Sequence, residues 1–128
     1  MTRRGFTLIE LLVVVVVIGI LATIAIPKFG GAKQKAFVAA MKSDLKNFVT
    51  AEESYLADYN QYGTAANVVS AGLFKASTDV ALVSTDGNAT GFSATATHPG
   101  LGGKTCGVFV GDATAPAMAP NEGEVKCD

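Results

Sequence analysis

Residues 6–26 read Phe-Thr-Leu-Ile-Glu-Leu-Leu-Val-Val-Val-Val-Val-Ile-Gly-Ile-Leu-Ala-Thr-Ile-Ala-Ile, and this stretch decides the fold. Glu10 is the only charged residue in a run that is otherwise almost wholly apolar. As a helix, the run spans roughly 32 Å at about 1.5 Å per residue, which matches a hydrocarbon core about 30 Å thick. The sequence therefore predicts a transmembrane helix.

Two features of the run need explanation. Val13–Ile18 are all β-branched, which favours a strand in water, but an isolated strand in lipid leaves its backbone groups unpaired, so the bilayer selects a helix. A cleaved secretory signal is a competing interpretation, because Arg3 and Arg4 precede the run. We favour a retained helix, since the run is long for such a signal, carries a carboxylate and is closely followed by Pro27.

The remainder of the chain is short and nearly neutral. The 128 residues include 10 Lys+Arg and 11 Asp+Glu, which gives a net charge of −1, and no Trp. Setting the apolar run aside leaves roughly a hundred residues, enough for one small domain with little margin of stability. The near-neutral charge offers no general attraction for nucleic acid, so no nucleic-acid site is expected.

The start of the run carries a specific motif. Residues 4–10 read Arg-Gly-Phe-Thr-Leu-Ile-Glu and, with the apolar run ending at Pro27, this segment resembles the processing site and leading helix of type IV pilins and related pseudopilins. The resemblance covers Arg3 to about Tyr59 well and the rest only in general plan. It implies that a prepilin peptidase cuts between Gly5 and Phe6, that Phe6 becomes an N-methylated amino terminus, and that the protein is a filament subunit.

Glu10 is the residue that a passive anchor does not explain. A carboxylate at the centre of a bilayer costs about 2.5 to 3.5 kcal/mol, and some penalty remains nearer the interface. After cleavage the amine of Phe6 becomes an available partner, either in the same chain or in a neighbouring one, and the resemblance favours the neighbour. The resemblance thus places Glu10 and Thr7 among the assembly residues. The alternative is a Glu10 that reaches the interface at a helix end and has no specific role.

Gly19 and Pro27 bracket the end of the run. Pro27 removes a backbone donor and clashes with the carbonyl of Thr23, which predicts a kink or a loosening of the helix there. The hydroxyl of Thr23 can bond to the Gly19 carbonyl and offset part of this loss. The resemblance implies local unwinding of this stretch in a filament, whereas an ordinary membrane helix kinked by its proline is the alternative.

A second apolar pattern follows the membrane run. Larger apolar residues recur at spacings of three, four or seven, which is typical of one helix face. They are Phe37, Met41, Leu45, Phe48, Tyr55 and Tyr59. The helix is therefore predicted to continue to Tyr59 and to pack this face on a soluble head. The lysines before residue 47, and Glu52, Glu53 and Asp58 after it, are expected on solvated faces, with pairing between axially shifted neighbours as the alternative.

Beyond Asn60 the composition changes to turn residues and short alternating segments. The expected strands are residues 80–84, 91–97 and 104–111. Residues 68–73 are expected to form a short helical turn, and residues 86–88 and 99–103 supply turns between strands. The predicted fold class is therefore α+β, a long N-terminal helix with a small antiparallel sheet.

Cys106 and Cys127 are the only cysteines, and their separation matches no metal-ligand spacing. A disulfide is the economical interpretation, worth about 3 kcal/mol for a loop of about 20 residues, and two free thiols are the alternative. Because a disulfide needs an oxidising compartment, the head is expected outside the cytoplasm, an orientation that the charges flanking the run leave open. The pair also resembles the C-terminal disulfide loop of type IV pilins, which many major pseudopilins of type II secretion lack.

No combination of residues predicts catalysis. His98 has no Cys, Ser or carboxylate at motif spacing and is expected at the surface or at a strand end. Asp79, Asp86 and Asp112 lack the spacing of a calcium loop, which related pseudopilins use, and are expected to be solvated. Asn88 opens an Asn-Ala-Thr triplet that matches a glycosylation sequon, although a turn role accounts for it. No enzymatic activity, cofactor or metal site is expected.

These features predict a precursor with four segments. They are a leader peptide at 1–5, a membrane and filament-core helix at 6–27, the amphipathic half of the same helix at 28–59 and a β head at 60–128. The predicted function is a homopolymeric type IV pilus-like surface filament, with the inner membrane, the prepilin peptidase and the pilus assembly machinery as partners. Two alternatives stay open: a major or minor pseudopilin of a type II secretion system, and a membrane-tethered ligand-binding domain.

Overall fold

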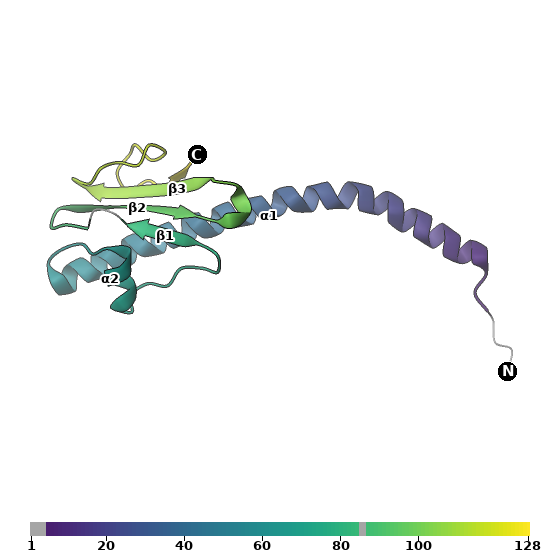
Figure 1. The fold of residues 1–128 in the computed structure, drawn as a ribbon, viewed down its shortest axis with the longest axis horizontal. Coiled ribbons are helices and arrows are strands. Elements are labelled where there is room, and N and C mark those ends of the chain that lie inside the picture. The colour runs from purple at the N-terminus through teal and green to yellow at the C-terminus, as the bar shows by residue number, and fades with distance from the viewer. Residues whose placement is uncertain (1–4, 85–86) are drawn as a thin grey trace. The chain divides into compact units, whose positions relative to one another are not determined.

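A computed structural model describes residues 5–84 and 87–128 and shows two helices and one antiparallel sheet (Figure 1). The elements are α1 (Leu8–Tyr59), α2 (Ala65–Ser70), β1 (Ala81–Ser84), β2 (Gly91–Thr97), β3 (Thr105–Gly111) and β4 (Lys126–Cys127), with a 3-10 turn at Pro99–Leu101. Arg3, Arg4 and Asp86 lie outside the described residues. The chain forms two compact units, divided between Lys33 and Gln34.

The long helix confirms the predicted continuation of the membrane run. α1 begins at Leu8, two residues later than expected, and ends at the predicted Tyr59. Asn60 follows with a φ of 55°. Asn tolerates this left-handed conformation better than most residues, and such a residue commonly ends a helix.

In the second unit, the apolar face of α1 packs against the sheet and forms the core. Met41, Leu45 and Phe48 are fully buried, as are Phe92 of β2 and Val108 of β3. The Phe48 ring makes edge-on contacts with Phe92 at 5.8 Å and with Phe74 at 5.2 Å between centroids. Such pairs add to the stabilisation that burial of the aromatic surface gives. The predicted packing face is therefore confirmed over its central part.

The last predicted member of that face is an exception. Tyr59 is 55% exposed and stacks on Tyr55 at a centroid distance of 4.3 Å, so the core ends one turn before the helix does.

The sheet has the order β1-β2-β3-β4 with every neighbouring pair antiparallel. The three predicted strands are confirmed to within one residue at each end. β4 was not predicted, because two residues carry no alternation of their own, and its place is set by the pairing of Cys127 with Cys106. The short helix is at Ala65–Ser70, earlier than the predicted 68–73, because Thr64 accepts a hydrogen bond from the Asn67 N–H and caps it there.

Two acidic side chains of α1 lie inside the head. Asp44 is 3% exposed, and its carboxylate accepts hydrogen bonds from the Ser77 N–H at 2.7 Å and the Ser77 hydroxyl at 2.8 Å. Glu52 is fully buried, so the expectation that it lies on a solvated face is wrong. Glu53 and Asp58 are exposed as expected.

His98 was expected at the surface or at a strand end, and only the second part is right. It follows β2 directly, but the side chain is buried and its ring stacks on Phe37 at a centroid distance of 3.8 Å. Its Nδ1 accepts a hydrogen bond from the Gly100 N–H at 3.0 Å, which caps the 3-10 turn. The ring is held by packing and capping, which explains its burial without a ligand.

The turn role of Asn88 is confirmed. Its Oδ1 accepts hydrogen bonds from the N–H and hydroxyl of Thr90 and from the N–H of Gly91, at 2.8, 3.0 and 2.9 Å. The side chain thus closes the turn that leads into β2.

Candidate functional site

The first turn of α1 brings two of the predicted assembly residues together. The N–H and the hydroxyl of Thr7 donate hydrogen bonds to Oε2 of Glu10 at 2.8 and 2.7 Å. The Glu10 N–H donates in return to the Thr7 hydroxyl oxygen at 3.3 Å. This reciprocal arrangement is a capping box, which satisfies backbone donors at a helix start and places a negative charge at the positive end of the helix dipole.

The capping box explains why Thr7 belongs with Glu10. The Thr-x-x-Glu spacing is itself a signal for a helix start. Because both donors go to the same oxygen, Oε1 of Glu10 keeps its capacity to bind a further donor.

The helix that follows leaves its apolar side chains uncovered. Leu8 is 87% exposed, and residues 13–17 are each about half exposed. Within the described residues, α1 contains an 18-residue stretch with a mean hydropathy of 3.0. No residue of this stretch is buried. By length and composition this stretch is able to span a membrane.

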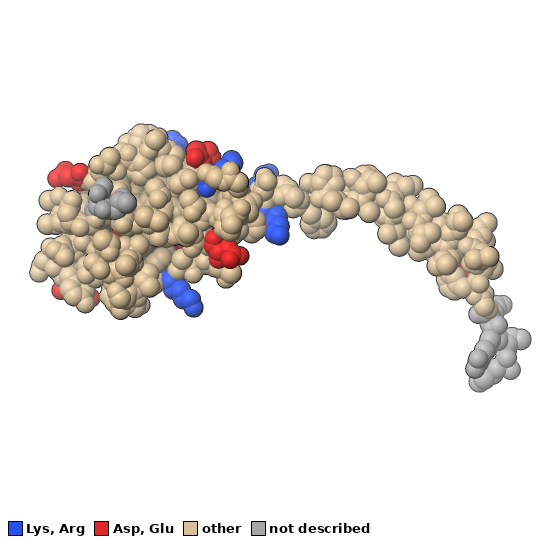
Figure 2. All heavy atoms as spheres, viewed as in Figure 1, with Lys and Arg blue, Asp and Glu red and all other residues tan. Residues whose placement is uncertain are grey.

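Charge is distributed differently over the two units. Glu10 is the only charged residue between Gly5 and Pro27. In the space-filling view, the apolar half of α1 shows almost no charged atoms, whereas Lys, Asp and Glu are scattered over the second unit (Figure 2).

Phe6 and Glu10 lie on the same part of the surface. Both line a shallow apolar hollow with Ile9, Val13 and Val14, and the Phe6 side chain is 81% exposed. Gly5 still precedes Phe6 in this chain, so the Phe6 nitrogen is an amide and not yet an amine. The pairing of Glu10 with a Phe6 amine stays a prediction.

The glycines of this region are not required by contacts within the chain. A Cβ added at Gly5 or Gly19 would meet no atom within 4 Å. If their small size serves a purpose, that purpose lies in contacts with something outside the chain. The role of Gly5 at a cleavage site stays a prediction.

Pro27 lies inside α1, which is assigned as one uninterrupted helix from Leu8 to Tyr59. The Thr23 hydroxyl bonds to the carbonyl of Ile20 at 2.7 Å, so the expected bond to the Gly19 carbonyl is wrong. In this conformation the threonine bonds three residues back instead of four. The predicted unwinding between Gly19 and Pro27 concerns a filament and stays a prediction.

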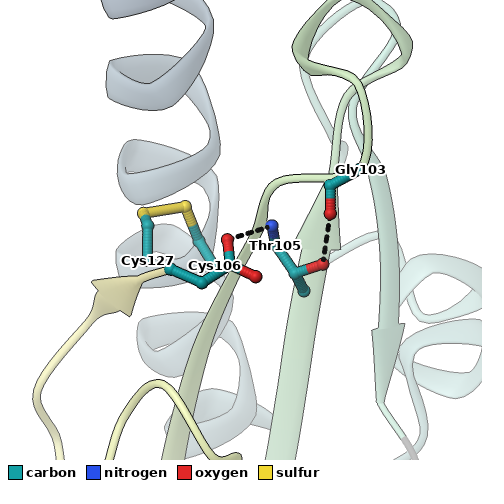
Figure 3. Close-up of a disulfide and its surroundings, with 5 residues drawn as sticks. Gly103, Thr105, Cys106 and Cys127 are labelled. Carbon is teal, nitrogen blue, oxygen red and sulfur yellow. Dashed lines mark hydrogen bonds between the residues drawn. A yellow bond between two sulfur atoms is a disulfide. The ribbon is translucent and has the colours of Figure 1, made fainter.

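The disulfide between Cys106 and Cys127 is confirmed and joins β3 to β4 (Figure 3). The bond is flanked by hydrogen bonds: the Asp128 N–H donates to the Thr105 carbonyl at 3.1 Å, and the Thr105 N–H donates to Oδ1 of Asp128 at 2.8 Å. The Thr105 hydroxyl donates to the Gly103 carbonyl at 3.4 Å. The C-terminal segment is therefore fixed to the sheet by covalent and polar contacts at the same place.

Residues suited to holding a metal do not gather in the part of the chain that the structure describes. Within residues 5–84 and 87–128, there is no group of three or more His, Cys, Asp or Glu placed to bind an ion. Of the three aspartates considered for calcium, Asp86 lies outside the described residues.

Comparison with known proteins agrees with the motif. The family described as the prokaryotic N-terminal methylation motif matches residues 1–26. The type IV major pilin protein of Myxococcus xanthus is 44% identical over 67 residues, which cover 52% of this chain and 30% of that protein. The type II secretion system core protein G of Pectobacterium carotovorum is 40% identical over 60 residues, which cover 47% of this chain and 38% of that protein.

A third relative matches a larger part of the chain. The type IV wide pilus major component of Thermus thermophilus is 34% identical over 98 residues, which cover 76% of this chain and 75% of that protein. This chain spans only about a third of the length of the Myxococcus and Pectobacterium proteins, 30% and 38%. The match to the Thermus protein is longer than the segment that ends at Tyr59, so the similarity extends into the head.

Proposed function

Because this chain belongs to the family of type IV pilins and related pseudopilins, we propose that it is the structural subunit of a type IV pilus-like surface filament. The subunit is made as an inner-membrane precursor. A prepilin peptidase cuts it after Gly5, Phe6 is N-methylated, and assembly machinery moves it into the filament.

One observation carries this proposal: a processing motif directly precedes a helix whose apolar side chains are exposed on all sides. Apolar surface of this extent is stable only in lipid or against other apolar surface. A filament core made of the same helix from many subunits supplies the second environment. Assembly then exchanges helix–lipid contacts for helix–helix contacts.

Glu10 favours the move of the helix from lipid into the filament. Its carboxylate is held at the helix start by Thr7, and Oε1 is open to another donor. The amine that cleavage creates at Phe6 of a neighbouring subunit is such a donor. Pairing the two charges removes an unfavourable carboxylate from lipid only when a subunit docks, and it fixes the axial register of the two helices.

The disulfide supports an orientation with the head outside the cytoplasm. Cytoplasmic thiols are kept reduced, whereas the periplasm and the cell surface allow disulfides to persist. In this orientation Gly5 lies on the cytoplasmic side, where the resemblance places cleavage.

A pseudopilin of a type II secretion system is the second candidate. Its support is the 40% identity with core protein G of Pectobacterium carotovorum, which is confined to 60 residues. The longer match to a pilus component of Thermus thermophilus and the C-terminal disulfide favour the surface filament.

The test is intact-mass analysis and electron microscopy of material sheared from the surface of the native organism. We expect long filaments whose subunit begins at methylated Phe6 and is two hydrogens lighter for the disulfide. Processed subunit found only in the cell envelope would favour the pseudopilin. Unprocessed subunit there would contradict both filament candidates and favour a tethered ligand-binding domain.

A variant at the cleavage site separates processing from folding. Gly5→Val is expected to leave the precursor uncut and to abolish filaments, because the larger side chain stands next to the scissile bond. Gly19→Ala is the matched control, since a Cβ there also meets nothing within the chain. It is expected to be processed normally.

A further inference from the structure

The buried carboxyl group of Glu52 is not used by the proposed filament function. Its side chain is fully buried in the head, on the face of α1 that packs the core. Oε2 accepts a hydrogen bond from the Gly63 N–H at 2.8 Å, and Oε1 has no hydrogen-bond partner. A buried carboxylate with one unpaired oxygen is unfavourable, whereas the neutral acid tolerates burial far better.

The hydrogen bond of Glu52 holds the connection between α1 and α2, residues 60–64. On one side of this connection, a Cβ at Gly63 would lie 3.1 Å from the side chains of Tyr55 and Val68. On the other side, the Gly63 carbonyl is packed so closely against Gly87 that a Cβ there would overlap it. The Tyr62 N–H also donates to the Asn88 carbonyl at 2.9 Å. The connection is thus enclosed between α1 and the turn before β2.

The charged groups around Glu52 do not offset its burial. On its own helix, the carboxylate of Glu53 is adjacent, and on the connection the Tyr62 hydroxyl donates to Glu53 at 3.2 Å. Within the described part of the chain, Glu52 has no ion-pair partner. Burial raises the pKa of the Glu52 carboxyl to about 7, against the opposing effect of the Gly63 N–H and with a smaller contribution from the charge of Glu53.

We propose that Glu52 is a proton-controlled latch, which closes the connection 60–64 onto α1 when its carboxyl is neutral and opens it when the proton is released to water. Ionisation places a charge among apolar neighbours with one oxygen unpaired. Water relieves this charge only if the connection moves away from α1, which breaks the bond to Gly63 and loosens the packing against Gly87. Because Glu52 and the connection 60–64 both belong to the second unit, the response is confined to the head.

The sign of the pH effect follows from linkage. The folded head binds the Glu52 proton more tightly than the unfolded chain does. The stability that this proton gives the folded head is therefore fully present below the ordinary pKa of 4.5. This stability falls as pH rises towards the pKa of the folded head, about 7, and then levels off. Acid therefore closes the latch, and alkali opens it.

The test uses the full chain in detergent micelles. NMR follows the carbon resonance of the Glu52 carboxyl and the amide resonance of Gly63 between pH 4 and pH 9. Tyrosine fluorescence follows unfolding of the head in urea, since the chain has three Tyr and no Trp. We expect the Glu52 carboxyl and the Gly63 amide to change together near neutral pH. The unfolding constant is expected to rise by more than about tenfold between pH 5 and pH 8.

Glu52→Gln keeps an oxygen for the Gly63 N–H but does not titrate, and it is expected to abolish this rise. Glu53→Gln is the matched control and is expected to retain most of it. A Glu52 carboxyl that titrates near its ordinary value in the wild-type chain would overturn the proposal without reference to any variant. An unchanged pH dependence in Glu52→Gln would overturn it as well.

Discussion

The two units of the molecule use the apolar residues of one helix in opposite ways. In the first unit Ile18 is 58% exposed, and its neighbours are similar. In the second unit Leu45 and Phe48 are fully buried against the sheet. The carboxylates also differ, because Glu10 is exposed and held by Thr7, whereas Glu52 is buried with one oxygen unpaired.

This difference shows where each part of the chain finds its stability. The head buries its apolar side chains in its own core, so substitutions there are expected to change folding. The membrane-length part of α1 does not bury its apolar side chains within the chain. Substitutions there are therefore expected to change association with lipid or with other subunits. The predictions below test this separation.

The largest expected effect is on assembly. Glu10→Gln keeps the size of the side chain but removes the charge that pairs with the Phe6 amine of a neighbour. Breaking a buried pair of this kind costs about 3 to 5 kcal/mol, so surface filaments should be lost while leader cleavage continues. Filament yield by electron microscopy and subunit mass measure the two steps.

Asp58→Asn is the control for Glu10→Gln, because it removes an exposed carboxylate from the other end of the same helix. It should leave filament yield near that of the wild type. Normal filaments from Glu10→Gln would show that the carboxylate has no role in assembly.

The next prediction concerns the core of the head. Phe48→Ala removes a ring that contacts Phe74 and Phe92, and it should lower the free energy of unfolding by about 3 to 5 kcal/mol. Urea unfolding of the full chain in detergent measures this change. Ile18→Ala, which also shortens an apolar side chain of α1, should change head unfolding by less than about 0.5 kcal/mol. Equal effects from the two variants would remove the distinction between the units.

The disulfide should have a slightly smaller effect. The double variant Cys106→Ser, Cys127→Ser releases a loop with a sequence separation of 21 residues. Loop-closure entropy gives a loss of about 3 kcal/mol in head stability. Urea unfolding of the wild type with and without reductant provides an independent comparison. A loss well below about 1 kcal/mol would mean that the hydrogen bonds of Asp128 hold the C-terminal segment without the covalent bond.

Much of this fold was predictable because its signals are local. Alternation placed three strands to within a residue, helical spacing carried α1 to Tyr59, and a pair of cysteines in an otherwise cysteine-free chain indicated the disulfide. The site at the start of α1 was found by its motif. The physical link between Thr7 and Glu10 is also local, because their Thr-x-x-Glu spacing is the signature of a capping box.

The remaining features depend on partners that are distant in sequence. Asp44 is buried because Ser77 supplies two donors, and His98 is buried because Phe37 stacks on it. The sequence around Asp44 and His98 carries no signal that identifies these partners. Glu52 is different, because the buried positions Phe48 and Tyr55 are separated by seven residues and Glu52 occupies the helical position between them. That gap in the apolar pattern was a signal that the carboxylate faces the core.

The smallest predicted effect compares two threonines that cap helices in different units. Thr64 caps α2, whose Val68 is fully buried, so Thr64→Ala should lower the free energy of head unfolding by about 1 kcal/mol. Thr7 caps α1 where nothing in the chain packs on it, so Thr7→Ala should leave head unfolding unchanged and increase hydrogen exchange in residues 8–11. Urea unfolding and amide exchange of the full chain in micelles measure the two outcomes. If Thr7→Ala weakened the head as Thr64→Ala does, the first turn of α1 would contribute to folding of the second unit. The head would then not be stabilised by its own contacts alone, and the separation between the two units would fail.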